Sequence, residues 1–94
     1  MVITHLHIAM TKREVLEIFF ENGRPLTPDA VCRQLSGFHF RSSVYSYLFR
    51  LHKQGLLLRQ TLYGRVAYEI SGRGIERLRF FRSQQKARPA EVGQ

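Results

Sequence analysis

The sequence predicts a small α+β domain in which three helices are followed by a two-stranded β-hairpin and a fourth helix. Three observations predict it: threonine and serine caps stand ahead of apolar stripes at helical spacing, the spacing becomes extended after Gly55, and Gly64 separates two apolar runs. Ninety-four residues make one domain, because a chain of this length buries only about two-thirds of its unfolded surface. An apolar fraction of 44% is sufficient for a folded core.

The first two helices are predicted from their ends. Thr11, followed three residues later by Glu14, predicts a reciprocal cap for a helix over residues 11–22, which the glycine of Asn22-Gly23 ends. Thr27 and Pro28 begin a second, short helix that ends before Gly37.

The third helix, over residues 41–54, has two contrasting faces. Because each residue of an α-helix is rotated by about 100° from the one before it, the apolar residues fall on one arc of the helix. This arc carries Val44, Tyr47, Leu48 and Leu51. The opposite arc has no acidic residue and carries Ser42, Ser43, Ser46, Phe49, Arg50 and Lys53. Small hydroxyls among long cations suit close approach to a duplex. Phe49 on this arc has three possible contacts: a thymine methyl, a sugar, or another part of the protein.

The remaining elements follow Gly55. Residues 56–62 and 66–70 read as strands of a hairpin whose tip is Tyr63-Gly64-Arg65. Ser71 predicts the cap of a fourth helix with Ile75, Leu78 and Phe81 along one side. We therefore expect an apolar leader at residues 1–10, a folded domain at 11–82, and a loose polar tail at 83–94.

This order of elements is that of a winged helix-turn-helix, in which the third helix enters the major groove of DNA. The run from Ser43 to Leu57 resembles the recognition helix and strand entry of winged-helix repressors of the MarR and PadR kind, typically Leu-x-x-Leu-x-x-x-Gly-Leu, here Leu48 to Leu56. Residues Tyr68 to Leu78 are similar to those families' wing exit, Tyr-x-Leu-Thr-x-x-Gly-x-x-x-Leu. The resemblance covers residues 11–80 and implies a DNA-binding fold.

The charge distribution points to a polyanionic partner. The formal net charge is +8. Up to Phe40 there are four basic and four acidic residues, whereas from Arg41 onward there are eleven basic and three acidic ones. A basic half of a small domain favours nucleic acid first and an acidic membrane surface second. A purely solubilising surface charge is the alternative.

Double-stranded DNA is the predicted partner, and its contacts can be assigned to the basic half. Arg41, Ser42 and Ser43 at the helix start are predicted to bind phosphate. Ser46, Arg50 and Lys53 face outward, with Arg50 the candidate for a bidentate guanine contact. Arg65 at the hairpin tip is predicted to reach the minor groove, and Arg59 to bind the backbone.

Catalysis and metal binding are not predicted. No nucleophile with a base, acid pair or phosphate loop is present in the sequence, and its histidines and single cysteine, Cys32, lack the spacing of zinc ligands. We expect no enzyme activity, no cofactor and no metal. One cysteine and the absence of a signal pattern or membrane-spanning run predict a cytoplasmic protein without a membrane partner.

A homodimer is also predicted. Phe80 points away from the side of the fourth helix that carries Phe81, and the leader, with Ile3 and Leu6, is apolar without an evident place in the core. We therefore predict that the two ends of the chain pair across a two-fold axis, with Ile3, Leu6, Phe80 and Phe81 at the interface. Packing of the leader on the fourth helix within one chain is the competing interpretation.

The leading function is sequence-specific DNA binding in transcriptional regulation. The alternatives are a protein-interaction module, and a protein that binds structured RNA or coats nucleic acid without sequence specificity.

Overall fold

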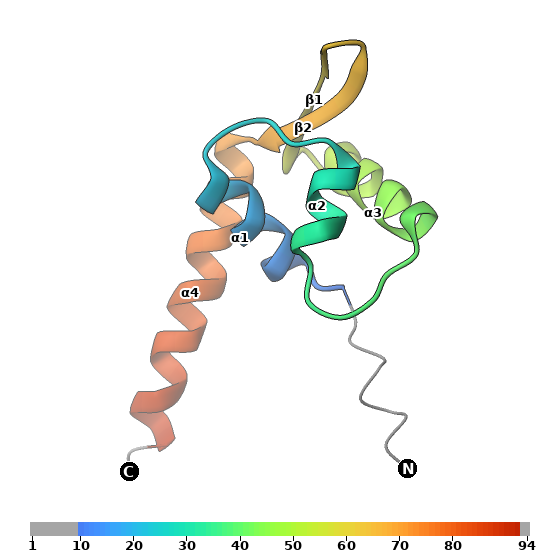
Figure 1. Cartoon of the computed structure of the whole chain (residues 1–94). Helices are drawn as coiled ribbons and strands as arrows, with labels where there is room; N and C mark the ends of the chain where they lie inside the picture. Colours follow the sequence, from blue (N-terminus) through green and yellow to red (C-terminus); the bar gives the residue numbers. More distant parts are fainter. Residues whose placement is uncertain (1–9, 93–94) are drawn as a thin grey trace, which may run out of the picture.

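The computed structural model describes the backbone of residues 10–92 and the side chains of residues 10–84 (Figure 1). The elements along the chain are α1 (Lys12–Asn22), α2 (Pro28–Gln34), α3 (Arg41–Lys53), β1 (Leu57–Leu62), β2 (Arg65–Ile70) and α4 (Gly72–Val92). This is the predicted order, and the fold is a winged helix-turn-helix. The predicted leader residues Ile3 and Leu6 lie outside the described part of the chain.

Threonine caps begin α1 and α2, as the sequence predicts. Thr11 Oγ1 accepts from the Glu14 backbone N–H at 3.1 Å, and Thr27 Oγ1 accepts from Ala30 at 3.3 Å. The reciprocal half of the first cap is wrong, because the Glu14 carboxylate instead accepts from the backbone N–H and hydroxyl of Ser36, at 2.8 and 2.7 Å. Glu14 therefore ties the start of α1 to the segment after α2.

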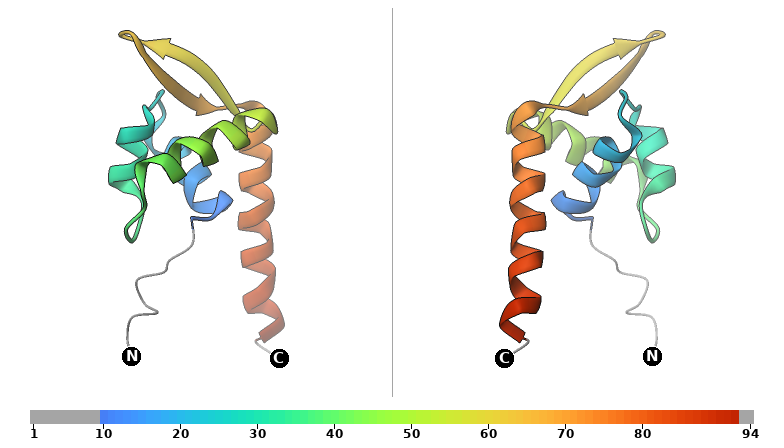
Figure 2. Two further views of the ribbon diagram at one scale, coloured as in Figure 1. Left: turned by 90° about the vertical axis from the view of Figure 1, so that its right-hand side faces the viewer. Right: turned by 90° about the vertical axis from the view of Figure 1, so that its left-hand side faces the viewer.

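The core is formed where α1, α2 and α3 meet the base of the hairpin and the first turns of α4. Its fully buried side chains are Val15, Leu16, Phe19, Leu26, Val31, Val44, Leu48, Leu51, Leu56, Leu57 and Leu78. Val44, Leu48 and Leu51 confirm the predicted apolar arc of α3, so the outward direction of its opposite arc is fixed by packing. Figure 2 shows α4 running beside this core and continuing beyond it.

The hairpin has a two-residue turn. Its strands pair antiparallel from Leu57 opposite Ile70 to Leu62 opposite Arg65, so the turn is Tyr63-Gly64, both with positive φ, at 52° and 76°. The three-residue tip predicted from the sequence is therefore wrong, and Arg65 is the first residue of β2. Two backbone hydrogen bonds, 2.8 and 2.9 Å long, join Tyr68 to Leu26 and hold the hairpin against the connector between α1 and α2.

Ser71 begins α4 and also anchors it. Its hydroxyl accepts from the Gly74 backbone N–H at 3.0 Å and donates to the Gly55 carbonyl at 2.6 Å. The predicted cap is confirmed, and it links α4 to the turn that follows α3. The helix then continues to Val92, past Ser83, where the sequence analysis placed the start of a loose tail. No helix among the described residues is long and apolar enough to cross a bilayer.

Candidate nucleic-acid interface

The outer face of α3 has the composition that the sequence predicts. It consists of Ser42, Ser43, Ser46, Phe49, Arg50 and Lys53, all of them exposed. The helix has no acidic residue at any position. Arg50 extends over the ring of half-buried Tyr47, 5.7 Å from its centroid, and burial raises the pKa of the Tyr47 hydroxyl. A continuous basic and hydroxylic surface results, which carries no negative charge of its own.

Phe49 organises two cations at the end of α3. Its ring is 42% exposed. Lys53 Nζ lies 5.5 Å from the ring centroid and Arg59 Cζ, from β1, lies 5.6 Å from it. Of the three contacts considered for Phe49, another part of the protein is therefore the one observed. The ring holds two of the predicted DNA-binding side chains, from two elements, beside one another.

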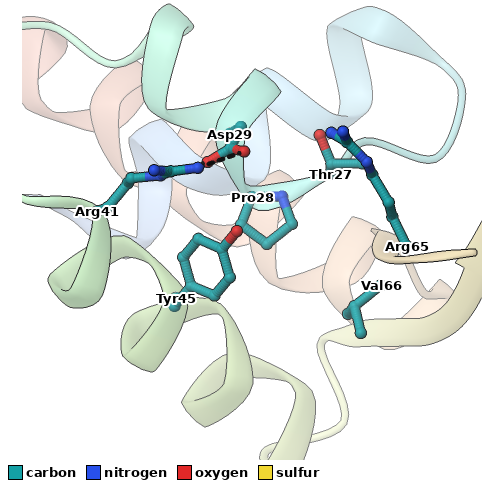
Figure 3. Close-up of a pocket in the computed structure, with 7 residues that line it drawn as sticks. All are labelled: Thr27, Pro28, Asp29, Arg41, Tyr45, Arg65 and Val66. Atoms are coloured by element: carbon teal, nitrogen blue, oxygen red, sulfur yellow. Dashed lines mark hydrogen bonds and ion pairs between the residues drawn. The ribbon is translucent and has the colours of Figure 1, made fainter.

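A cleft separates α3 from the hairpin. We call it the α3–wing cleft; its volume is about 330 Å³ and it is lined by Thr27, Pro28, Asp29, Arg41, Tyr45, Arg65 and Val66 (Figure 3). Three elements that are separate in the sequence, α2, α3 and β2, thus contribute side chains to one depression. It adjoins the outer face of α3 at Arg41 and Ser42.

Arg41 lies at the mouth of this cleft in a bidentate ion pair. Its Nε and Nη2 donate to Oδ1 and Oδ2 of Asp29, each at 2.9 Å. Hydrogen bonding to Arg41 is the main reason that the pKa of the Asp29 carboxyl is lowered, and the charges of Arg41 and Arg65 lower it further. Arg41 was predicted from the sequence to bind phosphate, and its pairing with Asp29 was not predicted. In the structure, two guanidinium groups face one carboxylate, which leaves the cleft with a net positive charge.

Arg65 faces the cleft. It projects from β2, and Figure 3 shows its guanidinium beside Thr27, directed toward α2. The position expected for Arg65, at the tip of the hairpin, is corrected by the register that pairs it with Leu62. The side chain at the tip is instead Tyr63, which is 96% exposed. That Arg65 binds DNA stays a prediction.

Tyr45 is a candidate residue that the sequence analysis missed. It lies on α3 between the two predicted arcs and is 45% exposed. Figure 3 shows its hydroxyl pointing into the cleft. The sequence shows that Tyr45 lies one turn after Arg41 on the same helix. It does not show that the hairpin folds back to make Tyr45 one wall of a cleft.

The acidic side chains of α1 are engaged elsewhere. Glu17 accepts from Arg82 of α4 at 2.7 Å and also pairs with Arg13 at 3.6 Å. The hydrogen bond from Arg82 is the main reason that the pKa of Glu17 is lowered. The Glu17–Arg82 pair fastens α4 to α1. Glu21 also pairs with Arg82, and Glu14 binds Ser36, so among the described residues Asp29 is the acid that lines the α3–wing cleft.

The predicted dimer residues have different surroundings. Phe80 is 53% exposed on α4, whereas Phe81 is partly buried and packs against the core of its own chain. A dimer contact through Phe81 would therefore compete with packing already present. No group of three His, Cys, Asp or Glu side chains among the described residues is arranged to hold a metal.

Solved structures share this fold. A PadR-family transcriptional regulator from Eggerthella lenta is similar with a TM-score of 0.69 and 23% identity, over 87% of this chain and 81% of that one. The ferric uptake regulator of Francisella tularensis is similar with a TM-score of 0.57 and 25% identity, over 70% of this chain and 55% of that one. A protein of the archaeon Sulfolobus tokodaii is similar with a TM-score of 0.59 and 22% identity, over 93% of this chain and 85% of that one. The resemblance to PadR regulators is confirmed for the fold. No family model and no curated protein matches the chain.

Proposed function

We propose that this chain is a transcriptional regulator that binds specific sequences of double-stranded DNA, with α3 in the major groove. The observation that carries the proposal is the combination of an acid-free outer face on α3 with a positively charged cleft beside it. A helix of this kind, presented outward by three buried aliphatic side chains, has the size and the donors that major-groove recognition requires.

The cleft fits the path of the DNA backbone in this arrangement. If α3 occupies the major groove and the hairpin covers the adjacent minor groove, one sugar–phosphate strand must pass between them. In this arrangement Arg65 and the Tyr45 hydroxyl donate to a phosphate in the cleft, and Arg41 binds the next one along. Lys53 and Arg59, held by Phe49, contact the backbone at the other end of α3. Ser46 and Arg50 are left to read base edges.

The comparisons support the regulatory part of the proposal. Two of the similar solved structures carry the names of regulators, one of them a transcriptional regulator of the PadR family. Their structural similarity supports the arrangement of the elements. Because their sequence identity to this chain is low, the choice of DNA sequence depends on the side chains of this chain. The charge also separates the proposal from a protein-interaction module, which has no need of an acid-free α3.

Gel-shift titrations of random duplex, genomic fragments and single strands across a salt series test the proposal. We expect the duplex to be preferred over single strands, and a subset of genomic fragments to persist at salt concentrations that release random duplex. Equal binding of all three would favour the coating protein. No binding at low salt would favour the interaction module.

We also propose that the working form is a homodimer paired through α4. Exposed Phe80 and the length of α4 beyond the core support it, and a two-fold pair would place two α3 helices on half-sites about one helical turn apart. Sedimentation equilibrium at micromolar concentration tests it. A dimer that Phe80→Asp disrupts is expected, and a chain that stays monomeric on its best duplex would refute it.

A further inference from the structure

The tip of the hairpin holds an unusual residue. Tyr63 has a φ of 52°, and it is the only non-glycine with positive φ in the part of the chain that the structure describes. Its side chain is 96% exposed. Two-residue hairpin turns in which both residues have positive φ favour asparagine or aspartate before glycine, because a larger side chain is strained there. The chain thus has a strained backbone and a fully exposed aromatic ring at one position, and neither contributes to its own packing.

A strained residue at an exposed tip indicates a role outside the folding of the chain. The residues around it are placed differently. Leu62 is partly buried, Gly64 has no side chain, and exposed Arg65 lines the α3–wing cleft. Tyr63 is therefore the side chain that the two-residue turn itself presents.

We propose that Tyr63 enters the minor groove of the bound duplex, next to the major-groove segment that α3 occupies. The inference rests on the proposed function. With the sugar–phosphate strand in the α3–wing cleft, the next surface that the tip meets is the minor groove on the far side of that strand. Arg65 then binds the backbone, and Tyr63 makes the groove contact that sequence analysis gave to Arg65.

The chemistry of the side chain fits this groove. The minor groove is about 6 Å wide, and its floor carries the acceptors adenine N3 and thymine O2. A phenol ring entering edge-on packs between the sugars, and its hydroxyl donates to one of these acceptors. The N2 amino group of guanine stands on the same floor and obstructs the ring. Tyr63 therefore favours A·T pairs at the positions it covers.

Substitution by asparagine separates binding from folding. Asparagine tolerates positive φ, so Tyr63→Asn is expected to raise the midpoint of thermal unfolding by about 4 °C. The same variant is expected to bind the duplex selected by wild-type protein about five- to tenfold more weakly, whereas Tyr63→Phe loses only the part due to the hydroxyl. A more stable protein with unchanged affinity would overturn the proposal.

A fluorescent probe locates the contact. The chain contains no tryptophan, so Tyr63→Trp introduces a single one at the tip, and Phe20→Trp provides a matched control on α1, at an exposed ring outside the proposed DNA and dimer contacts. Anisotropy of a labelled duplex reports complex formation independently. We expect acrylamide quenching of Trp at position 63 to fall severalfold on complex formation, and quenching at position 20 to stay unchanged. A complex that leaves the tip accessible would overturn this inference alone, whereas absence of any complex would overturn the proposed function.

Inosine identifies the groove. Inosine paired with cytosine keeps the major-groove pattern of a G·C pair and lacks the N2 amino group in the minor groove. The affinity ratio of wild type to Tyr63→Asn is measured on the selected duplex with guanine and with inosine in its flanking pairs. We expect a larger ratio with inosine. An equal ratio on both duplexes would contradict the minor-groove assignment.

Discussion

Arg41 binds both carboxylate oxygens of Asp29 at 2.9 Å, so an acid of α2 compensates a cation at the start of α3. The pair lines the α3–wing cleft, where we propose that a phosphate binds. Replacing Asp29 by asparagine should raise the affinity for duplex about threefold at low salt and steepen the salt dependence by up to about one unit, because the carboxylate no longer competes with phosphate for the Arg41 guanidinium. A weaker complex would instead mean that Asp29 is needed to orient Arg41. Affinity measured by anisotropy in a salt series distinguishes the two results.

Phe49 supports Lys53 and Arg59 without contributing charge. We expect Phe49→Ala to weaken duplex binding by about fivefold, because each of the two cations loses a modest cation–π contact that holds it in place. The salt slope should stay the same, because both cations remain. Phe20→Ala is the matched control. Phe20 is similarly exposed, and Arg82 Cζ lies 5.1 Å from the centroid of its ring, on the side of the molecule where α1 meets α4. Equal losses from the two variants would show that the effect is general loosening of the fold.

Gly74 is required by the close approach of α4 to the segment after α3. A Cβ at this position would overlap the Leu56 carbonyl oxygen and Ile70 Cγ1. Gly74→Ala is therefore expected to destabilise the fold by about 2 kcal/mol, although alanine ordinarily favours a helix by about 1 kcal/mol. Gly72→Ala, with no atom within 4 Å of the added carbon, serves as the control and should be neutral or stabilising. Urea denaturation of both variants measures the difference.

The ion pair of Glu17 with Arg82 gives the fold a pH dependence. Because the pKa of Glu17 is lowered in the folded chain, its contribution is present above the pKa of an unfolded glutamate and is lost as the pH falls through the folded pKa. Glu17→Gln should be less stable than wild type by about 0.5–1 kcal/mol at pH 7, and the difference should shrink as the pH falls below the pKa of an unfolded glutamate. A difference that is constant from pH 7 to pH 3 would show that the pair contributes through packing and not through charge.

Local signals predicted most of the fold. The caps at Thr11, Thr27 and Ser71 and the two arcs of α3 depend on residues within a few positions of one another, and the structure confirms them except for the reciprocal contact of Glu14. The hairpin was predicted with its turn one residue too long. Successive residues of a strand point to opposite faces, so this small error moved Arg65 from the cleft to the tip and left Tyr63 unnoticed.

The candidate site depends more on contacts between distant segments. Tyr45 becomes one wall of a cleft only because the hairpin folds back over α3, and Asp29 pairs with Arg41 across the turn between two helices. Likewise, the Glu14 carboxylate binds Ser36, 22 residues away, in place of its own helix end. Spacing along one helix carries no information on such pairs, so the sequence identified the cations and not their partners.

Charge reversal at two places on the surface shows whether α3 docks on DNA. Arg50→Glu with Lys53→Glu on the outer face of α3, and Arg77→Glu with Arg79→Glu on α4, each lower the formal net charge of +8 by four. All four positions are exposed, and thermal unfolding verifies that both variants fold. Affinity for the selected duplex is then measured by anisotropy at one salt concentration. We expect the α3 variant to lose at least about a hundredfold in affinity and the α4 variant about tenfold or less, because in the proposed complex only the first pair contacts DNA. Equal losses from the two variants would contradict it, because binding would then follow net charge and not a docked α3.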